Sequence, residues 1–184
     1  MDYKARLYLD VDGVLNAEYP KPKFEDPENP DNPQEFLIRV KSPNRQVNTY
    51  RMVYSPVVIR RLDELRERYN LELVWNSTWN ENVEVLRLPK YFKGLNDGRV
   101  LHGVMDYRAQ DEGAWSKWKA DVILKDQHND NLPFIWVDDV AVDYHGPTVD
   151  KAFPDVPKLL LNPYAVRGLT AEDLDKMEEF LKAL

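Results

Sequence analysis

Two short apolar segments of this chain each run into a pair of aspartates, and this pattern limits the possible folds more than any other feature. The segment RLYL ends at Asp10 and Asp12, and the segment LPFIWV ends at Asp138 and Asp139. Short apolar runs bounded by polar residues are typical of buried strands. If both strands belong to one parallel sheet, their carboxyl ends meet at the edge where open α/β sheets bind ligands.

Four carboxylates gathered at one sheet edge repel one another, so this arrangement needs a compensating cation. Mg²⁺ suits it, because this hard cation typically takes one or two protein carboxylates, water and a substrate phosphate. A single acidic strand end would be explained more simply by contact with solvent. Two such ends, one of them followed by Gly13, favour a metal-binding crevice.

Hydrophobic patterning predicts the remaining elements in a mostly alternating order. Ser55-Pro56 has the residues of a helix start, and Thr170 to Asp173 resembles a capping box with Asp in place of Glu. The order is strand, hairpin, helix, strand, helix, strand, strand, helix, which favours an α/β domain with a mostly parallel sheet. Residues 81–113 show no clear pattern. We expect strands at residues 6–12, 35–40, 49–54, 71–75, 132–137 and 158–161, and helices from residue 56, over 114–125 and from 170.

Length, charge and composition exclude several classes of protein. The 184 residues fit one domain. A net charge of −7 disfavours wrapping of duplex DNA, and the absence of cysteine excludes disulfides, thiol catalysis and thiolate zinc sites. No apolar stretch approaches the roughly 20 residues that span a bilayer. The N-terminus carries no signal-peptide pattern, so we expect a cytoplasmic protein that does not bind membranes.

The strand predicted at residues 71–75 is followed by Asn76-Ser77-Thr78. A hydroxyl at this edge of the sheet can donate a hydrogen bond to a phosphoryl oxygen. The alternative is that Ser77 or Thr78 caps the next segment, which is a common role for these residues.

The helix predicted from Ala114 offers two lysines with different surroundings. Lys119 lies in the middle of an apolar face, four residues from both Trp115 and Ile123, whereas Lys117 points to nearly the opposite side. A lysine on a buried face needs a partner, which the acidic crevice supplies, unless its ammonium group reaches solvent. Lys119 is therefore the first candidate for the site and Lys117 the second.

Taken together, these residues resemble the haloacid dehalogenase (HAD) superfamily of phosphotransferases over about residues 5–181. The four matching motifs are LDVDGVLN, LVWNSTW, a lysine within WSKWKADVI, and FIWVDD. A closer likeness is to a small bacterial and phage branch that also occurs as a domain in RNA-repair proteins. The resemblance implies a single Rossmann-like, three-layer domain over residues 1–184, with a small hairpin cap at residues 17–54.

The resemblance also implies a mechanism and its residues. Asp10 would be the nucleophile that forms an aspartyl-phosphate, and Asp12 would protonate the leaving oxygen and then deprotonate water. Mg²⁺ would be bound by Asp10, by the main-chain oxygen of Asp12, and by Asp138 or Asp139. The transferring oxygens would be held by Ser77 and Lys119, and substrate would also be bound by Thr78, Asn76 and Gly13.

The insert at residues 17–54 is where caps of this superfamily control access to the site. It is small and much of it reads as loop, with turn chemistry at Ser42-Pro43-Asn44. A small cap would leave the site open to a phosphate on a larger molecule. Its basic residues would form a lip for a phosphorylated end, or only a solvated hairpin; they are Arg39, Lys41, Arg45 and Arg51.

The leading hypothesis is therefore a Mg²⁺-dependent phosphatase that acts on a phosphorylated small molecule, a nucleotide or a nucleic-acid end. A non-catalytic phosphate- or partner-binding domain is the alternative. A receiver-like signalling domain needs an Asp at the middle strand, where Trp75 stands instead, and a nucleotide-sugar transferase needs more chain before its DxD motif. The spacing of the three histidines suggests no metal role. The sequence leaves open the substrate, the oligomeric state, and whether the tryptophans stack on a base or pack the core.

Overall fold

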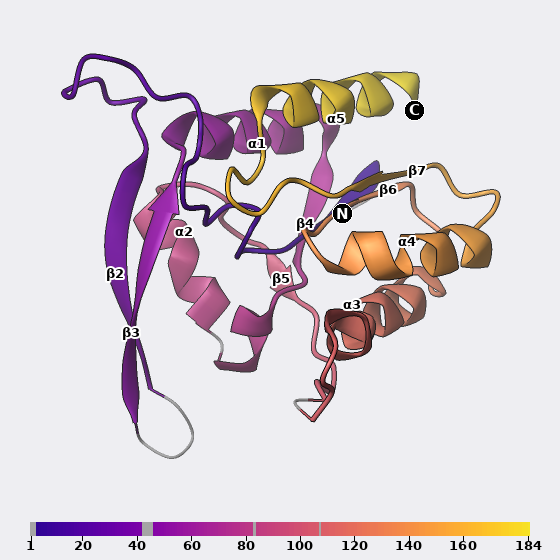
Figure 1. The fold of residues 1–184 in the computed structure, drawn as a ribbon. Helices are drawn as coiled ribbons and strands as arrows, with labels where there is room; N and C mark the ends of the chain where they lie inside the picture. Colours follow the sequence, from indigo (N-terminus) through magenta and orange to yellow (C-terminus); the bar gives the residue numbers. More distant parts are fainter. Residues whose placement is uncertain (1–2, 42–45, 83, 107) are drawn as a thin grey trace.

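A parallel sheet of five strands forms the centre of the computed structural model, which describes residues 3–41, 46–82, 84–106 and 108–184 (Figure 1). The strand order is β5-β4-β1-β6-β7, and every pair is parallel. The chain extends the sheet on one side of β1 and then on the other, so a topological switch point lies beside β1. The strands are β1 (Ala5–Leu9), β4 (Leu71–Trp75), β5 (Arg99–Val100), β6 (Phe134–Val137) and β7 (Lys158–Leu161).

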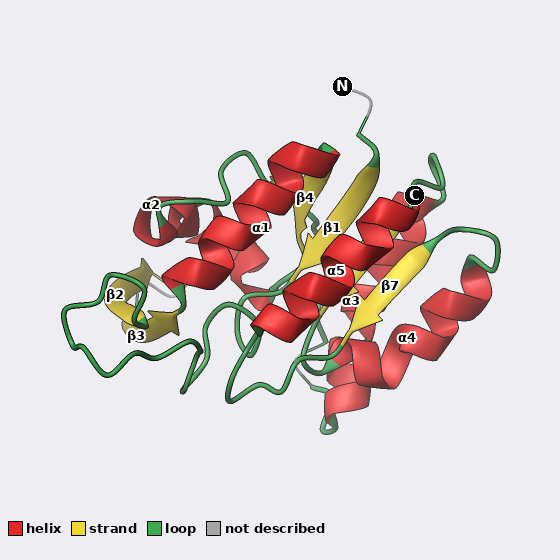
Figure 2. Ribbon diagram, turned by 90° about the horizontal axis from the view of Figure 1, so that it is seen from above, coloured by secondary structure: helices red, strands yellow, loops and turns green. Residues whose placement is uncertain are grey.

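Helices cover both faces of this sheet (Figure 2). One face carries α1 (Pro56–Tyr69) and α5 (Ala171–Ala183), and the other carries α3 (Glu112–Gln127) and α4 (Ala141–Ala152). The short helix α2 (Leu88–Phe92) follows two 3₁₀ turns, η1 (Thr78–Asn82) and η2 (Glu84–Arg87). The three-layer, Rossmann-like prediction is confirmed. Among the described helices, none is long and apolar enough to cross a membrane.

The core divides into two clusters because successive side chains of a strand point to opposite faces. Leu7 and Leu9 pack with residues of α1 and α5, whereas Tyr8 packs with residues of α3 and α4. All five residues of β1 are buried, as expected for a strand covered on both faces. This burial fixes the strand end that carries Asp10.

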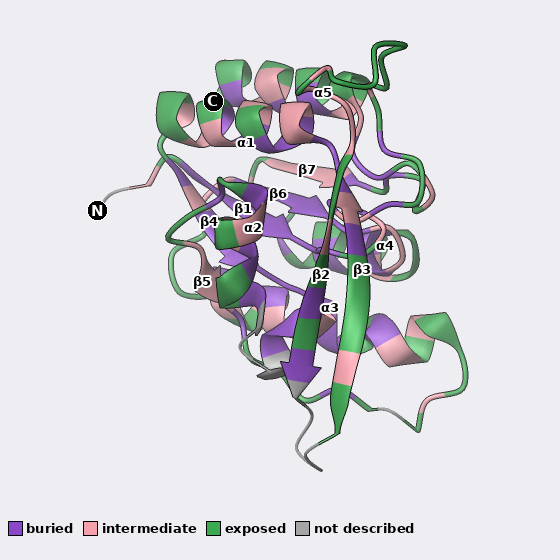
Figure 3. Cartoon of the chain, turned by 90° about the vertical axis from the view of Figure 1, so that its left-hand side faces the viewer, coloured by how far each residue is buried: buried purple, intermediate pink, exposed green. Residues whose placement is uncertain are grey.

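A two-stranded antiparallel hairpin, β2 (Gln34–Lys41) and β3 (Val47–Tyr54), stands beside the sheet. Figure 3 shows buried and exposed stretches along it. Phe36 stacks on Tyr91 of α2 with ring centroids 4.6 Å apart, so the hairpin is packed against the body of the domain. The predicted turn Ser42-Pro43-Asn44 and the predicted basic residue Arg45 lie outside the described residues.

Both predicted helix starts are confirmed. Ser55 caps α1 by accepting the amide of Val58 at 3.4 Å, with Pro56 in the first turn. Thr170 and Asp173 form a reciprocal capping box at the start of α5. Both helix starts could be predicted from the sequence because capping depends on residues only two or three positions apart.

The predicted order of two successive strands over residues 132–161 is wrong, because α4 lies between them. Neighbouring parallel strands need a long crossover, and α4 provides it between β6 and β7. Gly146 and Pro147 lie inside α4. Both residue types disfavour a helix interior, which hides the helical pattern from sequence analysis.

Candidate active site

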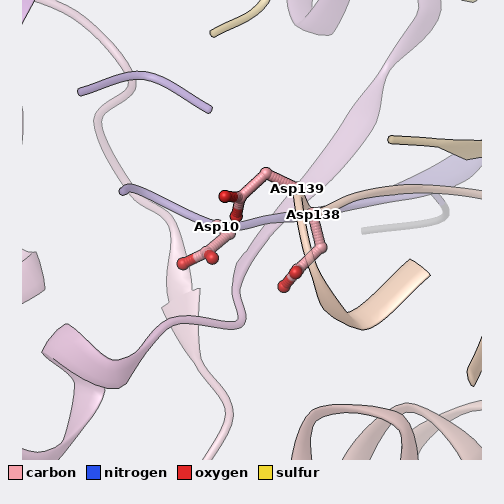
Figure 4. Close-up of side chains that lie close together, drawn as sticks. All are labelled: Asp10, Asp138 and Asp139. Carbon is pink, nitrogen blue, oxygen red and sulfur yellow. The ribbon is translucent and has the colours of Figure 1, made fainter. Parts of the chain in front are cut away.

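The acidic strand ends meet at the carboxyl edge of the sheet, beside the switch point. Asp10 follows β1, and Asp138 and Asp139 follow the neighbouring strand β6 (Figure 4). Leu9 pairs with Val137 in the strand register, so the residues that come next are neighbours. One carboxylate oxygen from each of the three aspartates lies within 4.8 Å of the other two.

Lys119 of α3 joins two of these aspartates. Its ammonium donates to Asp10 Oδ2 at 2.5 Å and to Asp138 Oδ2 at 2.7 Å, and the side chain is 3% exposed. Burial disfavours the charge on Lys119, but the fields of the two carboxylates outweigh burial and raise its pKa. Lys117 lies on the exposed side of α3 and pairs with Asp121 at 2.6 Å. Of the two candidate lysines, Lys119 is the one that reaches the acidic cluster.

Asp138 and Asp139 occupy different surroundings although they are adjacent. Asp138 is fully buried, and its Oδ1 accepts the amides of Val140 and Ala141 at 3.0 and 2.6 Å, at the start of α4. Asp139 lines a cavity instead. Asp138 therefore anchors α4 and the buried ammonium, whereas Asp139 faces the space where a ligand would bind.

The pKa values of this pair reflect an excess of negative charge. Burial raises the pKa of Asp138, although the ammonium beside it opposes the change. Burial, followed by repulsion from Asp10 and Asp138, raises the pKa of Asp139 to about 7. A bound cation would remove this penalty on the ionised form.

Asp12 is held by two hydrogen bonds from side chains outside the acidic cluster. Trp79 Nε1 donates to its Oδ2 at 2.8 Å, and Asn16 Nδ2 donates to its Oδ1 at 2.7 Å. Asp12 remains accessible through the cavity, yet desolvation by the surrounding walls raises the pKa of its carboxyl, partly offset by these two bonds. Tyr50 of the hairpin packs edge-on against Trp79 at 5.3 Å, so the hairpin contacts the support of Asp12.

Gly13 allows the backbone after β1 to pass close to Asp139. Its φ of 71° lies in the left-handed region that glycine tolerates best. A Cβ atom at this position would lie 2.2 Å from Asp139 Oδ2. The close approach explains why glycine follows Asp12 here.

The end of β4 places its three polar residues differently. Thr78 lines the cavity. Ser77 is fully buried and its hydroxyl accepts the Trp79 amide at 3.4 Å. Asn76 is also buried and donates to the carbonyl of Lys119 at 3.2 Å, which ties β4 to α3. Within the described residues, Thr78 is thus the hydroxyl residue of this segment in the cavity wall.

The cavity above these groups has a volume of about 430 Å³. Gly13, Lys119, Asp10, Asp12 and Asp139 all contribute to its wall. Sequence reasoning missed several wall residues and one supporting residue, which are Asn16, Glu18, Val140, Ala165 and Trp79. Three of them lie in or beside the motifs, since Asn16 ends LDVDGVLN, Trp79 ends LVWNSTW and Val140 follows Asp139. Glu18 and Ala165 come from loops whose path depends on tertiary structure.

The residues present fit a divalent cation. In the described part of the chain, three carboxylates converge around the single ammonium of Lys119, and Asp139 lines the cavity. Hard cations prefer this type of donor. Asp10 and Asp139 are the carboxylates that both reach the cavity and lie close together.

The domain has three layers around a parallel sheet, and at the switch point of this sheet a lysine pairs with the aspartates of an acidic cavity. This combination defines a phosphohydrolase domain of the HAD type. The chain belongs to the family described as the HAD domain in Swiss Army Knife RNA repair proteins, whose model matches residues 6–174. This match confirms the resemblance to the HAD superfamily and to its RNA-repair branch. No curated protein and no solved structure gives a significant match.

Proposed function

We propose that this domain is a Mg²⁺-dependent phosphatase that hydrolyses an accessible phosphomonoester through an aspartyl-phosphate. The observation that carries the proposal is the position of Asp10, which lies in the cavity wall with Lys119 on one oxygen and Asp139 nearby. The amide of Val11 donates to the other oxygen of Asp10 at 2.7 Å, so the carboxylate is held in one orientation. A fixed carboxylate open to a cavity is the geometry that a nucleophile needs.

In the first step, a carboxylate oxygen of Asp10 attacks phosphorus while the bond from phosphorus to the leaving oxygen breaks. Asp12 gives its proton to that oxygen, and its raised pKa supports a protonated fraction at the start. Trp79 and Asn16 keep the Asp12 carboxyl oriented. The products are an alcohol and the aspartyl-phosphate.

In the second step, water attacks the phosphorus of the aspartyl-phosphate and gives its proton to Asp12. The bond from phosphorus to Asp10 breaks, which releases phosphate and restores both carboxyl groups. Lys119 stabilises the carboxylate charge of Asp10 before the attack and after the release of phosphate. The hydroxyl of Thr78 supplies a donor to the phosphoryl oxygens, and Ser77 supports the same segment by accepting the Trp79 amide. Mg²⁺ held by Asp10 and Asp139 would neutralise charge on the phosphoryl group.

The proposed substrate is a terminal phosphate on a nucleotide or nucleic acid. The family description places such domains in RNA-repair proteins. The hairpin serves as a small cap, and Arg51 from β3 contributes a cation to the cavity wall. The whole chain acts as one domain in this proposal, and a cytoplasmic location stays a prediction.

The test is release of phosphate by purified protein from an aryl phosphate, mononucleotides and phosphorylated oligonucleotides. We expect turnover with Mg²⁺ and none with EDTA. Absence of turnover on all three classes, in protein that binds Mg²⁺ and is folded by circular dichroism, would instead support a non-catalytic binding domain.

A further inference from the structure

A second, larger cavity of about 950 Å³ adjoins the proposed active site. The two cavities share Glu18, Arg51 and Val53 in their walls. Arg51 lies at the boundary of the two cavities, so a ligand with its phosphate at Asp10 would extend past this residue to reach the second cavity.

Three chain segments that are far apart in sequence form the wall of this second cavity, and backbone hydrogen bonds connect them. The Ala17 amide donates to the Val53 carbonyl at 3.0 Å, and the Tyr19 amide donates to the Val166 carbonyl at 2.8 Å. These bonds join the loop after β1 to the hairpin and to the loop after β7. The cavity is thus a formed feature of the fold.

Exposed aromatic rings gather in this cavity. Tyr19 is 61% exposed, Phe24 is 41% exposed and Tyr164 is 69% exposed, and all three line it. Exposed apolar side chains that gather in one place, rather than singly, often mark a binding site. Flat rings that are open to solvent are the platforms on which unpaired nucleic-acid bases stack.

Basic side chains line the same cavity as the aromatic rings, although the protein as a whole is acidic. Lys21, Lys23 and Arg167 are exposed in the cavity wall, and their side chains enter none of the ion pairs or hydrogen bonds found among the described residues. The fourth cation of the wall, Arg51, is paired with Glu35. Two further glutamates line the cavity, Glu18 and Glu25, so its balance is slightly positive in a chain of net charge −7.

We propose that this second cavity binds the nucleotides next to the terminal phosphate of a single-stranded nucleic acid. The rings would stack on bases, and the lysines and Arg167 would contact backbone phosphates. A base in a duplex is stacked on its neighbours and has no free face, so the cavity selects single strands. This proposal rests on the proposed function, since it assumes that the terminal phosphate lies at Asp10.

The test compares Tyr19→Ala and Tyr164→Ala with Tyr144→Ala, a tyrosine that is 53% exposed and lines neither cavity. Substrates are an aryl phosphate and 5′- and 3′-phosphorylated oligoribonucleotides, single-stranded and in blunt duplexes. For single strands we expect KM to rise about tenfold in each cavity variant, by loss of base stacking. Turnover of the aryl phosphate should stay within twofold, and Tyr144→Ala should behave as wild type.

A second readout measures binding without turnover. Fluorescence anisotropy of a labelled, phosphorylated single strand gives its Kd for the wild type in EDTA, and Lys21→Gln combined with Lys23→Gln should weaken binding and flatten its salt dependence. The subsite would be overturned if the tyrosine variants had the same KM for single strands as the wild type, and if the double lysine variant bound single strands with the salt dependence of the wild type. If wild type hydrolyses nothing but binds single strands through these residues, the proposed function fails and the subsite stands.

Discussion

Two clusters of charged side chains lie at opposite ends of the same parallel sheet, and they differ in how their charges are balanced. The carboxyl-end cluster consists of Asp10, Asp12, Lys119, Asp138 and Asp139. The amino-end cluster consists of Arg6, Glu72, Arg99, Asp126 and Asp130. In the amino-end cluster two guanidinium groups pair with all three carboxylates, as in the bonds from Arg99 to Glu72 and to Asp126, both at 2.6 Å.

The contrast in charge balance separates structural from functional charge in this domain. Hydrogen bonds and ion pairs satisfy the amino-end cluster, and none of its residues lines either of the two cavities described above. The carboxyl-end cluster has four carboxylates and one ammonium, which bonds to two of them, and the cluster opens into a cavity. Excess charge of one sign is costly to a fold, so it persists where a ligand compensates it.

Replacing one aspartate in each cluster gives the largest expected contrast. Asp10→Asn should reduce phosphatase activity on the order of 10³-fold or more, because an amide cannot form the aspartyl-phosphate. Asp126→Asn should leave kcat/KM within about twofold but lower the thermal midpoint, since Asp126 accepts bonds from Arg99 and from the Tyr8 hydroxyl. Steady-state kinetics and thermal unfolding measure both. Full activity of Asp10→Asn would show that Asp10 is not the nucleophile.

The central cation of each cluster provides the next contrast, in stability. Lys119→Met leaves Asp10 and Asp138 buried without their ammonium, and breaking a buried pair in this way typically costs about 3–5 kcal/mol. Arg6→Met should cost a comparable amount, because it leaves Glu72 with one fewer donor.

Mg²⁺ distinguishes the two methionine variants. We expect Mg²⁺ to raise the unfolding free energy of the Lys119 variant by more than it raises that of the wild type, because the carboxylates have lost their ammonium. Its effect on the Arg6 variant should equal its effect on the wild type, as followed by denaturant titration with and without the metal. An effect of Mg²⁺ on the Arg6 variant that differs from its effect on the wild type, or no effect on any of the three proteins, would contradict a metal site confined to the carboxyl end.

Gly13→Ala tests how closely the backbone packs against the carboxyl-end cluster. The added methyl would meet the Asp139 carboxylate in a left-handed backbone conformation, so the loop must shift. A misplacement of about 1 Å can cost about 100-fold in rate. Gly146→Ala is the matched control, since its Cβ would lie 3.3 Å from Leu160 Cδ1 and far from catalysis. Equal kcat/KM for both alanine variants would show that Asp139 needs no close approach.

The residues of the carboxyl-end cluster could be predicted from the sequence because the patterns that indicate them are local. Acidic pairs after apolar strands, glycine after Asp12 and the position of Lys119 on an apolar helix face each depend on a few adjacent residues. Their convergence follows from the parallel sheet, whose class was also predictable from the order of elements. The roles of these residues in catalysis stay predictions.

Long-range partners were not predictable by the same reasoning. Arg6 and Asp130 are 124 positions apart, and nothing in either segment indicates the other. Trp79 was considered only as a packing or stacking residue, and its bond to Asp12 depends on the path of η1 after β4. Helix α4 was missed because Gly146 and Pro147 disfavour a helix in the local sequence. The helix forms because the parallel strands β6 and β7 need a crossover between them, which is a property of the whole sheet.

The response to pH should have opposite signs in the two clusters of the metal-free protein. The pKa of Asp139 is raised to about 7 in the fold by burial and by its acidic neighbours, above its ordinary value of 3.8. As pH falls from 8 to 5, the native carboxyl takes up a proton that the unfolded chain does not, so stability rises. In the amino-end cluster burial opposes ionisation of Glu72, but bonds from Arg99 and Arg6 lower its pKa, and a bond from Arg6 lowers that of Asp130.

Stability from the amino-end cluster is therefore complete above the ordinary carboxyl pKa and is lost as pH falls below about 4. We expect the thermal midpoint in EDTA to rise by a few degrees from pH 8 to pH 6, to peak near pH 5 and then to fall. Asp139→Asn should flatten the first part of this profile and leave the acid limb intact, and Mg²⁺ should raise the midpoint most at pH 8, where the carboxylates are ionised. A wild-type midpoint that falls steadily from pH 8 to pH 6 in EDTA would mean that the carboxyl-end cluster is already compensated without a cation, and the distinction between the two ends of the sheet would then be lost.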